Sequence, residues 1–231
     1  RVDYLNTNRA TADGGYALLS AMENDIPVAL SDTDPEKRAA LIKLFVEKGT
    51  WHTPTLVVTS SLKDLGFNDH PERLDALKYL PKAFLEKWQK MMASMEDELV
   101  PRFEWGPWFM ETVGLMHEAG VQFLAGTDSP PVPDYTPGLA LHFELQALVN
   151  AGLSPLSALQ SATLNPAKFF EIEHDLGSIE KDRFADILLL EKDPLEDINN
   201  TRHISSVLSR GQYFDRQALD GMLAGMIEDE V

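Results

Sequence analysis

The segment Gly120–Pro130 places a short apolar run directly before a cluster of small polar residues. The run VQFLA is typical of a buried strand, and Thr127, Asp128 and Ser129 follow it closely. In parallel α/β folds, the side chains that carry out chemistry lie at the carboxyl ends of such strands. By itself a Thr-Asp-Ser-Pro sequence is more often a turn or a helix cap. We nevertheless take Asp128 as the first candidate for a catalytic carboxylate.

The composition excludes several classes of function. The chain has 231 residues, of which 44% are hydrophobic and 25% charged, as expected for a globular protein with one large core. Its formal charge of −17 argues against nucleic acid and anionic membrane as partners, since both require a basic face. The absence of cysteine excludes thiolate metal sites, cysteine nucleophiles and disulfides.

Neither a membrane span nor a signal peptide is predicted within these residues. No apolar run approaches the roughly 20 residues needed to span a bilayer, and residues 1–8 do not resemble a signal peptide. We expect a soluble protein, cytoplasmic or exported. Because the chain begins with Arg1 in mid-pattern, we also expect it to be a piece of a longer protein.

The first two thirds of the sequence alternate between helices and strands. The predicted elements are a helix over 34–48, a strand over 51–58 that Pro54 makes irregular, helices within 71–120, a strand over 121–126, and a helix over 139–150. The first helix should bury Leu41, Leu44 and Phe45. Ser154-Pro155 and Asn165-Pro166 each predict an N-cap followed by proline at the first helical position.

The last third changes to short alternating segments. These predict strands over 178–180, 185–190, 204–208 and 212–214, followed by a helix over 216–227. Asp186 lies within one of the strands, and we expect it to be structural, paired with a turn or with Arg183.

Together these patterns predict an α/β fold. The order strand, helix, strand indicates a parallel region, and a TIM-type (β/α)8 barrel needs about 250 residues. We therefore expect the last part of such a barrel over 1–175 and the C-terminal strands of a small β-sandwich domain over 176–215. The remainder, 216–231, should be a C-terminal helix with an acidic tail.

Short motifs, in order along the chain, resemble the amidohydrolase superfamily. They are WHTPTL at 51–56, AGTD at 125–128, HFEL at 142–145, AGLSP at 151–155, ATLNPA at 162–167, GSI at 177–179 and FADILL at 184–189. Each motif is weak alone, but the ordered set is specific. Within the superfamily the chain most resembles the imidazolonepropionase-like and prolidase-like branch.

This resemblance implies a metal-dependent hydrolase that cleaves a C–N bond, as in a cyclic amide or a dipeptide. Superfamily members hold one or two divalent metals with a His-x-His pair, a lysine or glutamate, and further histidines; here we expect zinc. Their eighth-strand aspartate corresponds to Asp128, which is thereby implied to contact the metal and act as general base. A zinc-like ion lowers the pKa of bound water to roughly 7, and a nearby carboxylate can then accept its proton.

The sequence departs from the superfamily pattern in its histidines. It contains no His-x-His, and its six histidines, at 52, 70, 117, 142, 174 and 203, show no metal-pair spacing. In one alignment Tyr4 replaces a ligand histidine of the sixth strand. In the other, which we favour, that strand lies upstream of Arg1. Asp182 stands where the family usually has glycine, and aspartate tolerates a left-handed backbone.

Three more residues are candidate substrate contacts: Thr55, Ser129 and His142. Thr55 lies on the predicted strand and is able to face a pocket, while Ser129 is equally suited to capping a turn. For His142 the default interpretation is a hydrogen-bonded core histidine, with a role at the pocket edge as the alternative. The nearby His52 is best explained as a strand histidine that is hydrogen-bonded in place.

Two interpretations of function remain open. In the first, the chain is part of a metallohydrolase with a small-molecule substrate and is active only with its missing N-terminal portion. In the second, it is a non-catalytic fragment or a metal-free barrel relative that serves binding or assembly. An open arc of barrel strands leaves strand edges unpaired. We therefore expect the N-terminal portion, or self-association into a homo-oligomer, to cover them.

Overall fold

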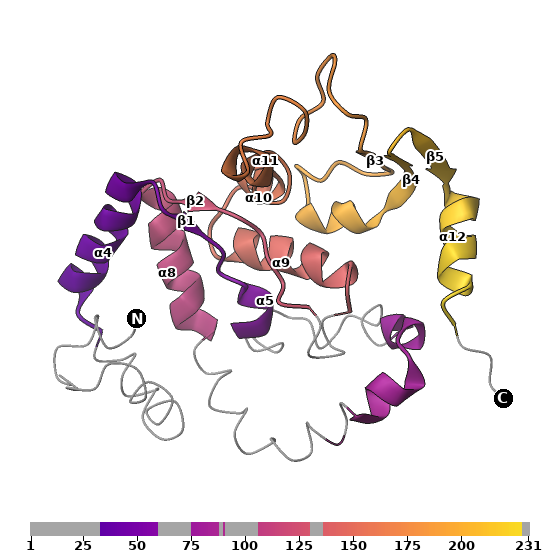
Figure 1. Cartoon of the computed structure of the whole chain (residues 1–231). Helices are drawn as coiled ribbons and strands as arrows, with labels where there is room; N and C mark the ends of the chain where they lie inside the picture. Colours follow the sequence, from indigo (N-terminus) through magenta and orange to yellow (C-terminus); the bar gives the residue numbers. More distant parts are fainter. Residues whose placement is uncertain (1–32, 60–74, 88–89, 91–105, 130–135, 228–231) are drawn as a thin grey trace.

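The computed structural model describes residues 33–59, 75–87, 90, 106–129 and 136–227, and these form a mixed α/β fold (Figure 1). Predictions that concern Tyr4, His70, the acidic tail after residue 227 and, within 71–120, residues 71–74, 88–89 and 91–105 lie outside these ranges. Within the described ranges, none of the helices combines the length and apolarity needed to cross a bilayer.

Helix α4 (Pro35–Lys48) begins and ends as the sequence predicts. The Asp34 side chain accepts hydrogen bonds from the backbone N–H groups of Glu36 (2.9 Å) and Lys37 (3.3 Å), and Gly49 ends the helix with φ 60°. The predicted inner face is partly wrong: Ile42 is the buried residue, whereas Leu44 is 43% exposed.

The strands β1 (Trp51–His52) and β2 (Gln122–Phe123) form a parallel pair. The parallel arrangement agrees with the prediction, but both strands are shorter than predicted. The chain leaves β1 before Pro54, which has no N–H to donate to a neighbouring strand, and turns into the short helix α5 (Leu56–Thr59). The prediction of a strand up to residue 58 was therefore wrong.

Four helices build the layer around this strand pair. They are α8 (Gly106–Glu118), α9 (Leu139–Asn150), α10 (Pro155–Ser161) and α11 (Leu164–Phe169). Before them, residues 77–79 form the 3-10 helix η2 and residues 82–87 are helical. The predicted Ser154 cap is confirmed, since its hydroxyl accepts the Ser157 N–H at 3.1 Å.

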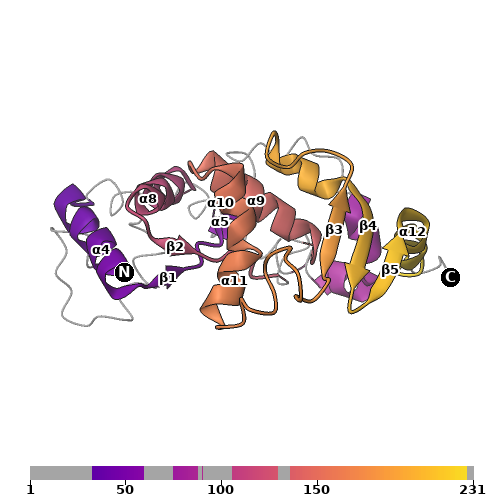
Figure 2. The same cartoon turned by 90° about the horizontal axis from the view of Figure 1, so that it is seen from above.

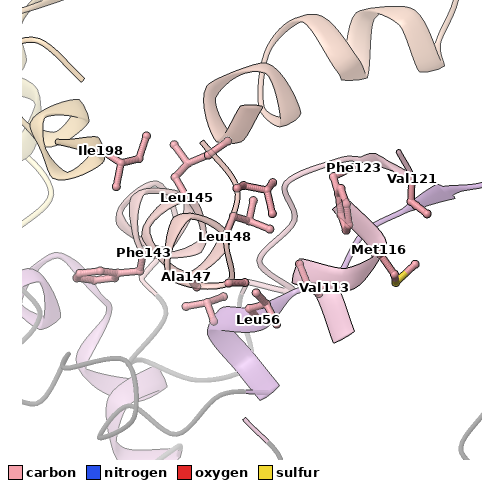
Figure 3. Close-up of a cluster of buried hydrophobic side chains, with 14 of the residues drawn as sticks. Leu56, Val113, Met116, Val121, Phe123, Phe143, Leu145, Ala147, Leu148 and Ile198 are labelled. Carbon is pink, nitrogen blue, oxygen red and sulfur yellow. The ribbon is translucent and has the colours of Figure 1, made fainter. Parts of the chain in front are cut away.

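The hydrophobic core is centred on α9 (Figure 3). Its residues Phe143 and Leu148 are among the largest fully buried side chains, together with Leu56 of α5. In Figure 3, Leu145 lies toward Ile198 and Ala147 toward Leu56, so α9 connects the strand pair to the C-terminal part of the chain. Burial of such side chains contributes about 1.5–3 kcal/mol each.

The C-terminal part forms a separate antiparallel sheet, at the opposite end of the structure from α4 (Figure 2). It contains β3 (Ile187–Leu190), β4 (Ile204–Ser209) and β5 (Gln212–Asp215), with the 3-10 helix η4 (Ile198–Arg202) before β4 and helix α12 (Arg216–Ala224) after β5. Three of the predicted strands and the final helix are thus present, but the predicted strand over 178–180 is not formed. Asp186 accepts the backbone N–H of Arg210 at 2.8 Å in the β4–β5 turn, which is the predicted pairing with a turn.

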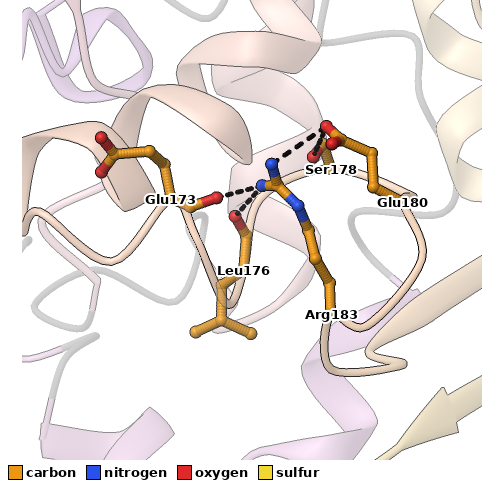
Figure 4. A network of polar contacts seen from close by, with 5 residues as sticks. All are labelled: Glu173, Leu176, Ser178, Glu180 and Arg183. Carbon is orange, nitrogen blue, oxygen red and sulfur yellow. Dashed lines mark hydrogen bonds and ion pairs between the residues drawn. The ribbon is translucent and has the colours of Figure 1, made fainter.

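Arg183 organises the loop before β3 (Figure 4). Its guanidinium donates to the backbone carbonyls of Glu173 and Leu176 and forms an ion pair of 3.0 Å with Glu180. The Ser178 hydroxyl donates to the same Glu180 carboxylate at 2.7 Å. This hydrogen bond and the Arg183 charge lower the pKa of Glu180. The loop thus satisfies its polar groups locally, which explains why no strand forms here.

Candidate functional site

The loops that follow β1 and β2 lie against each other at the carboxyl ends of the two strands. The Leu124 N–H donates to the His52 carbonyl at 3.0 Å, which extends the parallel pairing by one step. Beyond this point Gly126 faces Thr53: a Cβ atom on Gly126 would lie 2.4 Å from Thr53 Cγ2 and 3.9 Å from Thr55 Oγ1. The absence of a side chain at Gly126 therefore allows this close approach.

Each of these loops contains a non-glycine residue in the left-handed region. Thr55 and Asp128 both have φ 52°, a conformation that is uncommon for a β-branched residue such as Thr55. Asp128 is exposed at the end of its loop, and the Ser129 N–H donates to Thr127 Oγ1 at 3.3 Å. The structure thus brings the loops of Thr55, Asp128 and Ser129 to one end of the strand pair.

Two helices hold the end of β2 in place. The Ala125 N–H donates to the Ser161 carbonyl of α10 at 2.9 Å, and Asn165 Nδ2 of α11 donates to the Phe123 carbonyl at 2.9 Å. Asn165 was predicted to be an N-cap, and this prediction was wrong. The cap position is Thr163, and Asn165 lies in the first turn, where its side chain reaches across to the strand instead.

Glu144 holds the beginning of α5. The sequence analysis did not single out this residue. Glu144 belongs to α9, and it is 0% exposed. Oε2 accepts the backbone N–H of Val57 at 2.8 Å, and the Leu56 N–H lies near enough to act on the pKa of the carboxyl group. Burial raises the pKa of Glu144 to about 7, and the two N–H groups oppose this rise. The available signal was the one acidic residue of the helix LALHFELQALVN, which stands between Phe143 and Leu145.

The two candidate histidines lie in packed surroundings. His52 contacts the rings of Phe45 and Phe123, with centroid distances of 6.0 and 5.8 Å, and burial lowers its pKa. Nδ1 of His142 is 2.9 Å from Thr201 Oγ1 at the contact between α9 and η4. Burial, with the Arg202 charge, lowers the pKa of His142. This environment favours the core interpretation of His142, and its role in substrate binding stays a prediction.

The described residues do not form a metal site by themselves. None of their His, Asp and Glu side chains gather in groups of three or more that would hold an ion, whereas zinc takes three or four protein ligands. At the loop ends they supply one candidate donor, Asp128. The described residues alone therefore do not support a catalytic step on a metal.

Substitution of Gly126 by alanine should push the two loops apart. A methyl group 2.4 Å from Thr53 Cγ2 forces one loop to move, and such overpacking costs about 1–3 kcal/mol. The free energy of unfolding, measured by urea denaturation, should fall by this amount. Combining Gly126→Ala with Thr53→Ser removes the clashing methyl and should restore most of the loss. Equal stability of the single and double variants would contradict the close contact.

The fold and these loops define an α/β protein that gathers polar residues at the carboxyl ends of parallel strands. Residues 14–213 match the model of the amidohydrolase family, and the chain belongs to this family. The match confirms the resemblance that the ordered motifs indicated.

Known proteins that are similar to the chain include a deaminase, a dipeptidase and a hydrolase. An adenine deaminase from Rubrobacter xylanophilus is 46% identical over 56 residues, which are 24% of this chain and 9% of that protein. The structure of a Xaa-Pro dipeptidase with bound methionine covers 79% of this chain with a TM-score of 0.55, and its 24% identity shows the fold alone. Molinate hydrolase covers 88%, with a TM-score of 0.53 and 25% identity. The chain spans only 38% and 41% of these two structures.

Proposed function

We propose that this chain is the C-terminal portion of a metal-dependent hydrolase that cleaves a C–N bond in a small molecule. Membership of the amidohydrolase family supports this class of reaction. In this proposal β1 and β2 are the last strands of a TIM-type (β/α)8 barrel over 1–175. The β3–β5 sheet contributes to a small domain over 176–215, and 216–231 completes the chain.

The observation that carries the proposal is the contact between the loops after β1 and β2. Gly126, two residues before Asp128, packs against Thr53 at the end of parallel strands, which is where α/β proteins assemble active sites. Asp128 accepts a proton from the attacking water and passes it to the leaving nitrogen. Thr55 and Ser129 contact the substrate, with His142 as a further candidate. A divalent metal, for which we expect zinc, would be held in part by Asp128 and would supply electrostatic activation; its other ligands would have to come from outside the described residues.

Relatives suggest which substrates to test. The names adenine deaminase and Xaa-Pro dipeptidase both denote cleavage of a C–N bond, in an aminopurine and in a dipeptide. We therefore propose a cyclic amide, an amino-substituted ring or a dipeptide as the substrate class. The remaining partner in this proposal is the N-terminal portion of the same protein, or a second copy. Apolar side chains such as Leu188 and Leu189 are exposed on the C-terminal sheet, which supports a partner that covers this surface.

The proposal is tested on the full-length protein by metal analysis and by turnover. Mass spectrometry of the purified protein should find at least one divalent metal per chain, and chelation should remove the activity. Hydrolysis should be detected with adenine, cyclic amides or Xaa-Pro dipeptides as substrates. A metal-free protein that turns over none of them would refute the proposal and favour a barrel relative that serves binding or assembly.

A further inference from the structure

We infer that Glu144 is a positioning residue, which holds the loop after β1 and thereby the neighbouring loop that carries Asp128. Glu144 lies on neither loop and touches no reacting atom in this assignment. That Glu144 holds the loop follows from the geometry alone, whereas the effect on turnover rests on the proposed function.

The first step is the contact between Glu144 and α5. The first N–H groups of a helix have no acceptor within the helix. Glu144 Oε2 supplies one from α9, at 2.8 Å from the Val57 nitrogen. Leu56 and Val57 are both 0% exposed, so in the native packing bulk solvent does not reach their N–H groups. An unsatisfied buried donor costs far more than an average hydrogen bond contributes.

The second step leads from α5 to Asp128. Thr55 precedes α5 directly and is held at φ 52°, a conformation that persists only where the surroundings impose it. Thr53, two residues earlier, is the residue against which Gly126 packs. Gly126 in turn lies two residues before Asp128. Glu144 therefore fixes the loop that contains Thr53. The loop packed against it carries Asp128, the proposed base.

The third step concerns how each loop is anchored. The end of β2 is held from α10 and α11, through Ser161 and Asn165. The beginning of α5 is tied to α9 by the hydrogen bond from the Val57 N–H to Glu144. Both loops are thus anchored to helices by hydrogen bonds. Glu144 provides this anchor for the loop after β1.

The experiment measures amide hydrogen exchange in the full chain for the wild type, Glu144→Ala, Glu144→Gln and Leu148→Ala. Leu148 is the matched control, because it is also fully buried on α9 but its aliphatic side chain cannot accept a hydrogen bond. In Glu144→Ala, exchange of the Leu56 and Val57 amides and of the segment 124–129 should rise about tenfold or more beyond that in Leu148→Ala. Glu144→Gln keeps an oxygen acceptor and should recover most of the protection. If Glu144→Ala does not fold, Glu144→Asp replaces it, because its carboxylate is retracted by one methylene.

Turnover gives a second readout. In Glu144→Ala, kcat should fall about tenfold or more with a smaller change in KM, since misplacing a catalytic group by about 1 Å can cost 100-fold in rate. Leu148→Ala should not reproduce this split, and Glu144→Gln should restore kcat. An exchange pattern in Glu144→Ala that matches Leu148→Ala would overturn the inference. Local exchange changes in a protein that hydrolyses none of the substrates would support the positioning of the loop and refute the proposed function instead.

Discussion

Asp128→Asn is expected to lower kcat of the full-length protein by about 10³-fold, because an amide cannot accept the proton of the attacking water. The change should leave the fold intact. Asp128 is exposed and has φ 52°, and asparagine tolerates the left-handed conformation as well as aspartate does. Steady-state kinetics on the substrate found for the wild type, together with thermal unfolding of both proteins, measures the effect.

The chain offers a matched control for this substitution in Asp182. It is also exposed and also left-handed, with φ 68°, but lies in the loop before β3 beside Arg183. Asp182→Asn therefore introduces the same chemical change without touching the loops after β1 and β2, and kcat should stay within about threefold of the wild type. Full activity in Asp128→Asn, or equal losses in the two variants, would exclude Asp128 as the base.

Local signals in the sequence predicted much of the fold. Asp34 and Gly49 bound α4 as their capping chemistry requires, and Ser154 caps α10. The parallel pairing of β1 with β2 followed from the alternation of strands and helices. These features depend on residues close in sequence, or on topology rules that hold for many folds. The convergence of Thr55 and Asp128 at one end of the strand pair was predictable for the same reason.

The errors arose where a distant partner decides the structure. Pro54 was noted as an irregularity, but the helix that follows it is also held by Glu144, which is 87 residues away from Val57. Asn165 carries every local mark of a cap, yet its side chain donates to Phe123, 42 residues earlier. A sequence pattern reports the local preference of such a residue and does not reveal which remote backbone group will compete for it.

The contribution of Glu144 to the stability of the protein should fall as the pH rises from about 4.5 to about 7. Burial raises the pKa of this carboxyl from 4.5 to about 7 in the folded state. Between these values the folded protein holds a proton that the unfolded chain has released, so the stabilisation is fully present below pH 4.5 and is lost as the pH passes 7. The expected loss in the free energy of unfolding is about 3 kcal/mol.

Glu144→Gln isolates this contribution from the other titrating groups. The amide is neutral at every pH and nearly isosteric with the protonated acid, so the wild type and the variant should have similar stability at pH 4.5. At pH 8 the variant should be the more stable by about 3 kcal/mol. His52 and His142, whose pKa values burial lowers, act in the opposite direction: they destabilise the fold as the pH falls below 6.5. Both are present in the two proteins, so their contributions cancel in the difference. Urea denaturation of both proteins from pH 4.5 to 8 measures it, and a difference that does not change with pH would show that Glu144 titrates normally.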